Sequence, residues 1–218
     1  MNYYIIDYIN SPKGESGICC KSIYSLDNVC KHCGTGAKLI SNLKTKGLSN
    51  VKSDFFSTLD KDFIISENLY QFLVSKGINL NFLRKVLDSR NKELSFYHIN
   101  TEISFPKFSP TSVGLITEHQ CPVCKRNGYY SDIIIGNQKD TPNMIKQLKL
   151  IYQGISQEFL ESSDIFNTWE CLGVSNLKAE AMKVIRYAPP MLIVSERIKK
   201  AFEEYGVKNA VFEKVIIK

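Results

Sequence analysis

The sequence predicts an α+β fold with mixed sheets, and two observations lead to this prediction. Short apolar stretches at 63–65 and 192–194 are each followed by a stretch with helical apolar spacing and then by a second apolar stretch. In addition, two Cys-x-x-Cys pairs lie far apart in the chain and could meet at one metal ion. We therefore expect two strand–helix–strand units and a zinc-ribbon-like four-cysteine site that joins the two halves of the chain.

The two predicted units are a sequence repeat. The stretch from Phe63 to Val86 aligns without gaps with the stretch from Leu192 to Val215. A chain of 218 residues can form one large domain. We therefore predict a single globular domain, 1–218, with an internal pseudo-repeat whose halves are roughly 1–108 and 109–218.

Each predicted helix has the same end signals. Ser66 and Ser195 can accept a hydrogen bond from a free N–H of the first turn. A glutamate follows each serine, where the helix dipole favours a negative charge. Gly77 and Gly206 suit the left-handed position just past a helix end. The second strands are expected at 80–86 and 211–217.

The remaining elements are predicted from composition and from turn residues. β-Branched and aromatic enrichment favours strands, and the prolines near 107–111 favour a loop between the halves. Strands are expected at 3–9, 51–59, 94–105, 132–135 and 148–152, with a helix over 144–150 as the alternative to the start of the last one. The stretch 163–173, which starts with serine and ends with glycine, predicts a short capped helix.

Composition favours a cytoplasmic protein. The N-terminus lacks the basic and apolar regions of a secretory signal, and no apolar stretch approaches the about 18 residues of a membrane span. The chain carries 28 Lys and Arg against 22 Asp and Glu, a net charge of +6. A sequence pI near 8.8 is below what a strongly basic nucleic-acid-binding domain shows, which argues against nucleic acid as a partner. We expect no membrane partner.

Four of the seven cysteines form the pairs Cys30-Lys-His-Cys33 and Cys121-Pro-Val-Cys124. Two such turns can supply four thiolates to one tetrahedral Zn²⁺ ion. The whole stretch 34–120 separates the pairs, which is more than in a standard four-cysteine ribbon, so the ion would close a long loop. We predict a structural Zn²⁺ site with no open position for water or substrate. Gly34 suits the tight turn after Cys33, whereas Cys124 lacks a following glycine.

Other roles for the cysteines remain open. Cys121 and Cys124 could instead form a redox dithiol, although such a motif should open a helix, and the residues after Cys124 suggest a turn into a strand. Cys19-Cys20, His32 or His119 could replace a zinc ligand. Cys171 is expected to be a small buried apolar residue.

The sequence contains no GxxxxGK(S/T) phosphate loop and no HExxH, GxSxG or GxGxxG motif. Three histidines leave few candidates for acid–base catalysis. Glu158, Glu161 and Asp164 lie at helical spacing and are expected to be solvated surface charge. We therefore predict that the protein is not an enzyme and has no catalytic residues.

The two Cys-x-x-Cys turns, the run 190–199 (Pro-Met-Leu-Ile-Val-Ser-Glu-Arg-Ile-Lys) and the ending 206–215 resemble the double-CxxCG family of bacterial polymorphic-toxin immunity proteins. The resemblance covers both cysteine pairs and roughly the range 159–218. It implies a cytoplasmic antitoxin that binds one cognate toxin, with structural zinc. The toxin-binding residues are unknown.

Two alternatives belong to other functional classes. A zinc-ribbon nucleic-acid-binding protein would bind its ligand in a strongly salt-dependent way, but only scattered basic residues (Lys31, Lys125, Arg126) flank the turns. A dithiol oxidoreductase would need a thiolate of low pKa that is free to react.

Overall fold

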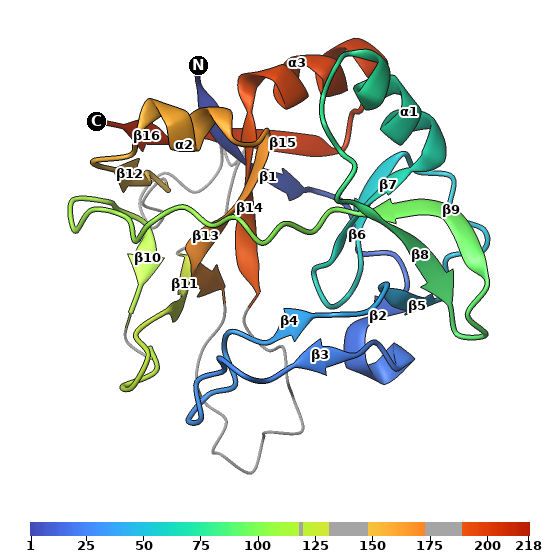
Figure 1. Ribbon diagram of the computed structural model, residues 1–218, viewed down its shortest axis with the longest axis horizontal. Coiled ribbons are helices and arrows are strands. Elements are labelled where there is room, and N and C mark those ends of the chain that lie inside the picture. The colour runs from blue at the N-terminus through green and yellow to red at the C-terminus, as the bar shows by residue number, and fades with distance from the viewer. Residues whose placement is uncertain (118–119, 131–147, 173–188) are drawn as a thin grey trace, which may run out of the picture.

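The computed structural model describes residues 1–117, 120–130, 148–172 and 189–218 (Figure 1). Two six-stranded mixed sheets form the framework of the described structure. The α-helices are few and short, so the fold is rich in sheet rather than clearly α+β. No helix in the described part of the chain is long and apolar enough to cross a membrane.

The first sheet combines the beginning of the chain with its second half. Its order is β10 (Leu115–Ile116), β11 (Asn127–Tyr130), β13 (Ile165–Leu172), β14 (Pro190–Ser195), β1 (Tyr3–Tyr8) and β15 (Ala210–Lys214). Strand β1 lies between β14 and β15 and is antiparallel to both.

The second sheet, which curls in Figure 1, is built from the first half of the chain. Its order is β2 (Glu15–Ser16), β5 (Lys44–Lys46), β8 (Arg84–Asp88), β9 (Glu93–His98), β7 (Phe63–Ser66) and β6 (Phe55–Ser57). Strand β9 lies between β7 and β8 and is antiparallel to both.

Smaller elements complete the described structure. Strand β3 (Tyr24–Ser25) pairs with β4 (Lys38–Leu39), and β12 (Ile151–Tyr152) pairs with β16 (Ile216–Ile217). A 3₁₀-helix (Gly17–Cys20) follows β2, and a short helix, α2 (Gln157–Glu161), precedes β13.

The two predicted strand–helix–strand units are present and have the same topology. Helix α1 (Glu67–Ser75) connects β7 to β8, and helix α3 (Glu196–Tyr205) connects β14 to β15. In each unit a third, antiparallel strand separates the two. The register also matches: Tyr97 of β9 lies opposite Lys85, and Tyr4 of β1 lies opposite Lys214, the counterpart of Lys85 in the repeat. We call these the α1 unit (β6, β7, α1, β8, β9) and the α3 unit (β13, β14, α3, β15, β1).

Each helix begins directly after the predicted capping serine. The Ser66 hydroxyl accepts a hydrogen bond from Leu69 N–H and the Ser195 hydroxyl accepts one from Ile198 N–H, so both cap their helices. Gly77 and Gly206 have the expected positive φ angles, +73° and +89°.

An aspartate that precedes the neighbouring strand holds each capping serine. The Ser66 N–H donates to the Asp54 carbonyl, and the Ser195 N–H donates to the Asp164 carbonyl, both at 2.9 Å. Each serine hydroxyl also donates to Oδ1 of the same aspartate. This Asp–Ser clasp connects the first strand of each unit to the start of its helix.

The predicted helix at 163–173 is wrong, because residues 165–172 form strand β13, and residue 173 lies outside the described residues. Ser163 does not cap a helix, and its hydroxyl instead bonds to the backbone of Ile165. A second sequence repeat carries the correct signal: Ser163-Asp-Ile-Phe-Asn-Thr168 matches Ser53-Asp-Phe-Phe-Ser-Thr58, which leads into β6. Buried Phe166 and Thr168 alternate along the strand as in a sheet.

The other predicted strands exist with different limits. The strand predicted at 3–9 is β1, whereas those at 51–59, 94–105 and 148–152 are reduced to β6, β9 and β12. The strand at 80–86 starts later, as β8, and 211–217 is divided into β15 and β16. The loop at 107–111 is confirmed. Residues 132–135 and most of 144–150 lie outside the described residues.

One hydrophobic cluster includes both units. Leu69 and Leu73 of α1 belong to the same buried cluster as Ile198 and Phe202 of α3. The helices also touch at the surface, where the Phe72 and Tyr205 rings lie 5.1 Å apart and Lys76 pairs with Glu204. A second buried cluster lies around Tyr3, Phe105, Tyr152 and Phe166.

Candidate metal centre

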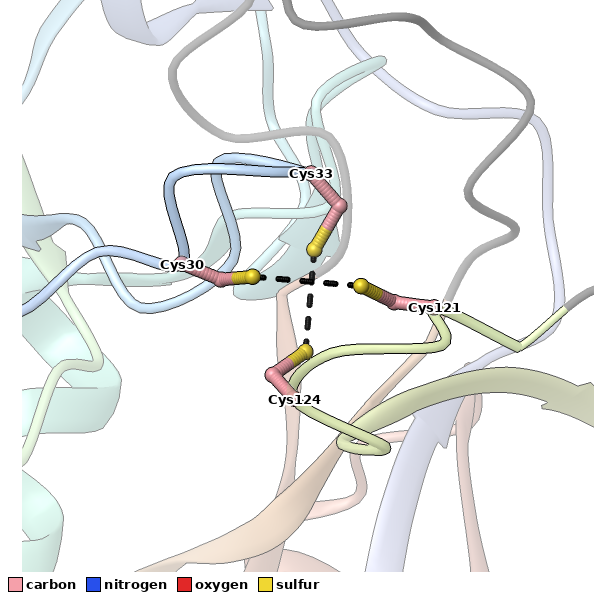
Figure 2. A group of neighbouring side chains, drawn as sticks. All are labelled: Cys30, Cys33, Cys121 and Cys124. Atoms are coloured by element: carbon pink, nitrogen blue, oxygen red, sulfur yellow. Dashed lines mark hydrogen bonds between the residues drawn. The ribbon is translucent and has the colours of Figure 1, made fainter.

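The four sulfur atoms of the two Cys-x-x-Cys turns meet at one point (Figure 2). The Sγ atoms of Cys30 and Cys121 are 3.8 Å apart, and those of Cys33 and Cys124 are 3.7 Å apart. All four lie within 4.8 Å of one another. A tetrahedron with Zn–S bonds of about 2.3 Å has S–S edges of about 3.8 Å. The cluster therefore fits a metal ion such as Zn²⁺.

The first turn lies in the connection between β3 and β4. Cys30 N–H donates to the Thr35 carbonyl at 2.9 Å, and Gly34 N–H donates to the Cys30 carbonyl at 2.7 Å. Gly34 has a φ angle of +73°, which glycine adopts at little cost. The predicted role of Gly34 in the tight turn is confirmed.

The second turn lies between β10 and β11 and repeats the geometry of the first. Lys125 N–H donates to the Cys121 carbonyl at 3.2 Å, and Lys125 has a φ angle of +54°. A lysine thus takes the conformation that Gly34 has in the first turn. The side chain of buried Asn127 accepts a hydrogen bond from Cys121 N–H at 2.7 Å. As predicted, the motif leads into a strand.

The protein environment affects the thiols differently. Burial raises the pKa of Cys30, but hydrogen bonds from the Cys33 and His32 N–H groups and from neighbouring thiols outweigh it and lower the pKa to about 7. Burial raises the pKa of Cys33 and Cys124. A metal ion that binds as a tetrathiolate must therefore displace protons from these two sulfurs.

Two of the four ligand residues are buried, two are half-buried, and all four offer sulfur. Cys33 is 6% exposed and Cys121 is 0% exposed. Four thiolates complete a tetrahedral shell, so a zinc ion held by all of them would have no position for water or substrate. Such a centre can hold two distant segments together, and it cannot provide Lewis-acid catalysis at an open position.

Among the described residues, the group of possible metal ligands at this centre consists of the four cysteines alone. His32 is exposed, and His119 lies outside the described residues. Cys19 and Cys20 form a separate group with Glu15. Cys171 is buried, as predicted.

A buried histidine–aspartate pair was not predicted. His98 Nε2 lies 3.2 Å from Asp62 Oδ1, and the Ser16 hydroxyl donates to Asp62 Oδ2 at 2.7 Å. The sequence signal for the pair is weak, because Asp62, directly before β7, and His98, at the end of β9, are distant in the chain. The pair contributes to the wall of a cavity of about 180 Å³ between the sheets, next to Gly34 and Arg126.

The acidic residues at 158–170 do not form one solvated surface. Glu158 and Glu161 are exposed, as predicted. Asp164 is buried, however, and binds both Ser195 and Arg197, the latter at 2.9 Å, so its prediction as solvated charge is wrong. Glu170 is also buried, and its Oε1 atom accepts a hydrogen bond from Phe108 N–H at 3.1 Å.

No protein-family model matches the chain, and no curated protein matches it. The observations that bear on function are therefore the fold, the cysteine cluster and the exposed surface around it.

Proposed function

We propose that the protein is an immunity protein that binds and neutralises one cognate bacterial toxin in the cytoplasm, without catalysis, and that Zn²⁺ in the four-cysteine centre is structural. The observation that carries this proposal is the closed tetrathiolate geometry, with S–S distances of 3.7 and 3.8 Å. The toxin-binding part of the proposal rests on the resemblance of both cysteine turns to the double-CxxCG family.

The proposed role of zinc is to brace two connections that the sheets hold weakly. The first turn is carried by the two-residue strands β3 and β4, and the second follows the two-residue strand β10. Such short pairings contribute few hydrogen bonds, whereas a structural zinc site contributes folding free energy directly. Joining Cys33 to Cys121 and Cys124 also restricts a long loop in the unfolded chain.

Exposed apolar residues beside the first turn support a docking surface. Ile23, Leu26 and Ile40 are 56%, 42% and 55% exposed. Ile23 and Ile40 are neighbours, because the Ile40 N–H donates to the Ile23 carbonyl at 3.0 Å. Exposed apolar groups that cluster are typical of interaction sites. We propose that this β3–β4 surface, which the zinc site holds in place, contacts the toxin.

The charge distribution favours a toxin that is not a nuclease. An inhibitor of a nuclease is expected to present acid to a basic cleft. This chain has a net charge of +6, and of its acids at 158–170 only Glu158 and Glu161 are exposed.

Co-expression with a candidate toxin domain, taken from a neighbouring open reading frame, tests the proposal. Cells that die with the toxin alone should survive with the wild-type protein. The variant Cys121→Ser should lose protection, whereas Cys171→Ser, which changes a buried cysteine outside the four-cysteine group, should retain it. Death of cells that contain soluble, zinc-loaded wild-type protein would refute the immunity function.

A second pair of variants tests the contact surface. The double variant Ile23→Asp/Ile40→Asp should abolish toxin binding, and the charge reversal Glu158→Lys/Glu161→Lys should leave it intact. The opposite result would show that the toxin contacts helix α2 and not the β3–β4 surface.

The alternative, a zinc-ribbon nucleic-acid-binding protein, has less support. Of the three basic residues beside the turns, Arg126 donates to the Trp169 carbonyl at 3.1 Å and lies over the Trp169 ring at 5.2 Å. Its side chain is therefore already engaged within the protein. Binding to DNA or RNA that weakens steeply with salt would favour this alternative.

A further inference from the structure

A second group of metal-ligand side chains lies apart from the four-cysteine centre. Glu15, Cys19 and Cys20 bring a carboxylate oxygen and two sulfurs within 4.8 Å of one another. The Sγ atoms of Cys19 and Cys20 are 3.6 Å apart, which is close to the S–S edge of about 3.8 Å in a zinc tetrahedron. Although adjacent in sequence, the two sulfurs are thus near enough to bind one ion.

The local backbone explains this approach. Glu15 lies in β2, and the chain then forms the 3₁₀-helix Gly17–Cys20. Two positive φ angles limit that helix, +78° at Gly17 and +66° at Lys21, whose N–H group closes the turn. Antiparallel pairing of β2 with β5 holds Glu15 beside the helix. The three ligands are therefore placed by regular structure rather than by a long loop.

A second carboxylate lies next to this group. Asp60 Oδ2 accepts a hydrogen bond at 3.0 Å from the N–H of Ser16, the residue that follows Glu15. Metal ions stabilise coordinating thiolates, and a divalent cation at this position would also be attracted by the two carboxylates.

The exposure of the ligands indicates what kind of site this is. Cys20 is 5% exposed, whereas Cys19 and Glu15 are exposed. Three protein ligands with an accessible side leave a fourth position for water, unlike the closed tetrathiolate centre. Sulfur ligands select thiophilic ions over Mg²⁺ or Ca²⁺.

We propose that Glu15, Cys19 and Cys20 form a second, solvent-open site for a thiophilic divalent cation, Zn²⁺ or Cd²⁺. Ligation by two thiolates and one carboxylate binds the ion more weakly than four thiolates do, so this site loads after the four-cysteine centre and loses its ion first. This proposal is independent of the immunity function.

Zinc titration of the protein that already holds one zinc per chain tests the site. Isothermal calorimetry, in a buffer with a non-thiol reductant, should find one further Zn²⁺ per chain in the wild type. The double variant Cys19→Ser/Cys20→Ser should bind no further Zn²⁺, and Glu15→Gln should bind it more weakly. The control Cys171→Ser should bind one further ion, as the wild type does.

Alkylation gives a test that needs no variant. In the wild type, the second equivalent of Zn²⁺ or Cd²⁺ should slow iodoacetamide labelling of exposed Cys19, as measured by mass spectrometry of its peptide. Labelling at an unchanged rate, or a second ion that still binds to the Cys19→Ser/Cys20→Ser variant, would overturn the proposal.

Discussion

The α1 unit and the α3 unit share a topology and an Asp–Ser clasp, but they differ in how that clasp is supported. In the α3 unit Ser195 and Asp164 are buried, and Asp164 also binds Arg197 of the same unit. In the α1 unit Ser66 and Asp54 are half-buried, and Asp54 receives a hydrogen bond from Tyr205 of helix α3 at 3.3 Å. The α3 unit supports its own clasp, whereas the clasp of the α1 unit depends in part on its neighbour.

The units also obtain their middle strands differently. Strand β9 follows β8 after a short turn, so the α1 unit pairs locally. The α3 unit takes β1 from the beginning of the chain, whereas β15 lies near its end. Pairing between distant strands has a larger loop-closure cost and forms more slowly. The same unit can therefore take its middle strand from a neighbouring or from a distant part of the chain.

The largest effect should come from matched truncations in the shared core. Leu69→Ala and Ile198→Ala occupy equivalent positions of the repeat, and both side chains are fully buried. Each should cost about 2–5 kcal/mol in the free energy of unfolding. Because both residues belong to one hydrophobic cluster, each variant should shift a single urea transition.

Two spectroscopic probes of that transition test whether the two units unfold together. Circular dichroism reports on both units, and the fluorescence of Trp169, the only tryptophan, reports on the α3 unit. If Leu69→Ala shifts the circular dichroism transition but not the fluorescence transition, the units unfold separately and do not share one cooperative core.

Removal of the capping hydroxyls should have the next largest effect. Ser195→Ala and Ser66→Ala each remove a helix cap, which costs about 0.5–2 kcal/mol. Ser195→Ala should lie at the upper end because it also leaves buried Asp164 without one of its hydrogen bonds. Chemical denaturation measures both, and equal losses would contradict the inference that the two clasps differ.

These contrasts show what could be predicted from the sequence. The units around Ser66 and Ser195 were predictable because apolar spacing, a cap and a terminal glycine all agree locally. Strand β13 was not predicted, because Ser163 and Gly173 also suit a helix and only comparison with the stretch at 53–58 favours a strand. The order of strands in the sheets could not be predicted from the sequence, since the pairing of β1 with β15 depends on tertiary contacts.

The candidate site was predictable to a similar degree. The spacing of Cys30, Cys33, Cys121 and Cys124 pointed to one cluster because the chemistry of CxxC turns is local. The group formed by Cys19, Cys20 and Glu15 was not predicted, since its geometry depends on a 3₁₀-helix that follows a two-residue strand. Short elements of this kind have almost no periodicity to detect.

A pH-dependent contrast follows from the longer first strand of the α3 unit. Strand β13 continues past the point where β6 ends, and it buries Glu170, whereas Asp60 at the corresponding position is exposed. Burial raises the pKa of Glu170, although the Phe108 N–H and the charges of Lys107 and Arg126 partly oppose this. The folded state thus holds the proton more tightly than the unfolded state.

The sign of the expected effect follows from this difference. Ionisation of Glu170 costs stability above its folded-state pKa, and stability is regained as the pH falls through that value towards 4.5. The melting temperature of the wild type relative to Glu170→Gln should therefore increase on acidification from neutral pH. A wild-type advantage that shrinks on acidification would contradict the assignment.

The smallest effects should come from the two cysteine turns. Lys125 and Gly34 both have positive φ angles, which cost a non-glycine residue roughly 1–2 kcal/mol. Lys125→Gly should therefore stabilise the protein slightly, after about 0.4–1 kcal/mol is lost to the greater freedom of glycine in the unfolded chain. Gly34→Ala should destabilise it. Thermal melts of zinc-loaded protein measure both, and a loss of stability in Lys125→Gly would show that the turns are not equivalent.

X-ray absorption at the zinc edge tests the tetrathiolate centre most directly. The sample should be the purified Cys19→Ser/Cys20→Ser variant, so that the four-cysteine centre is observed alone. We predict one zinc per chain with four sulfur neighbours at about 2.3 Å. Absence of a stoichiometric metal ion, or a shell that contains nitrogen or oxygen, would contradict the proposal that Cys30, Cys33, Cys121 and Cys124 brace the fold through one closed zinc site.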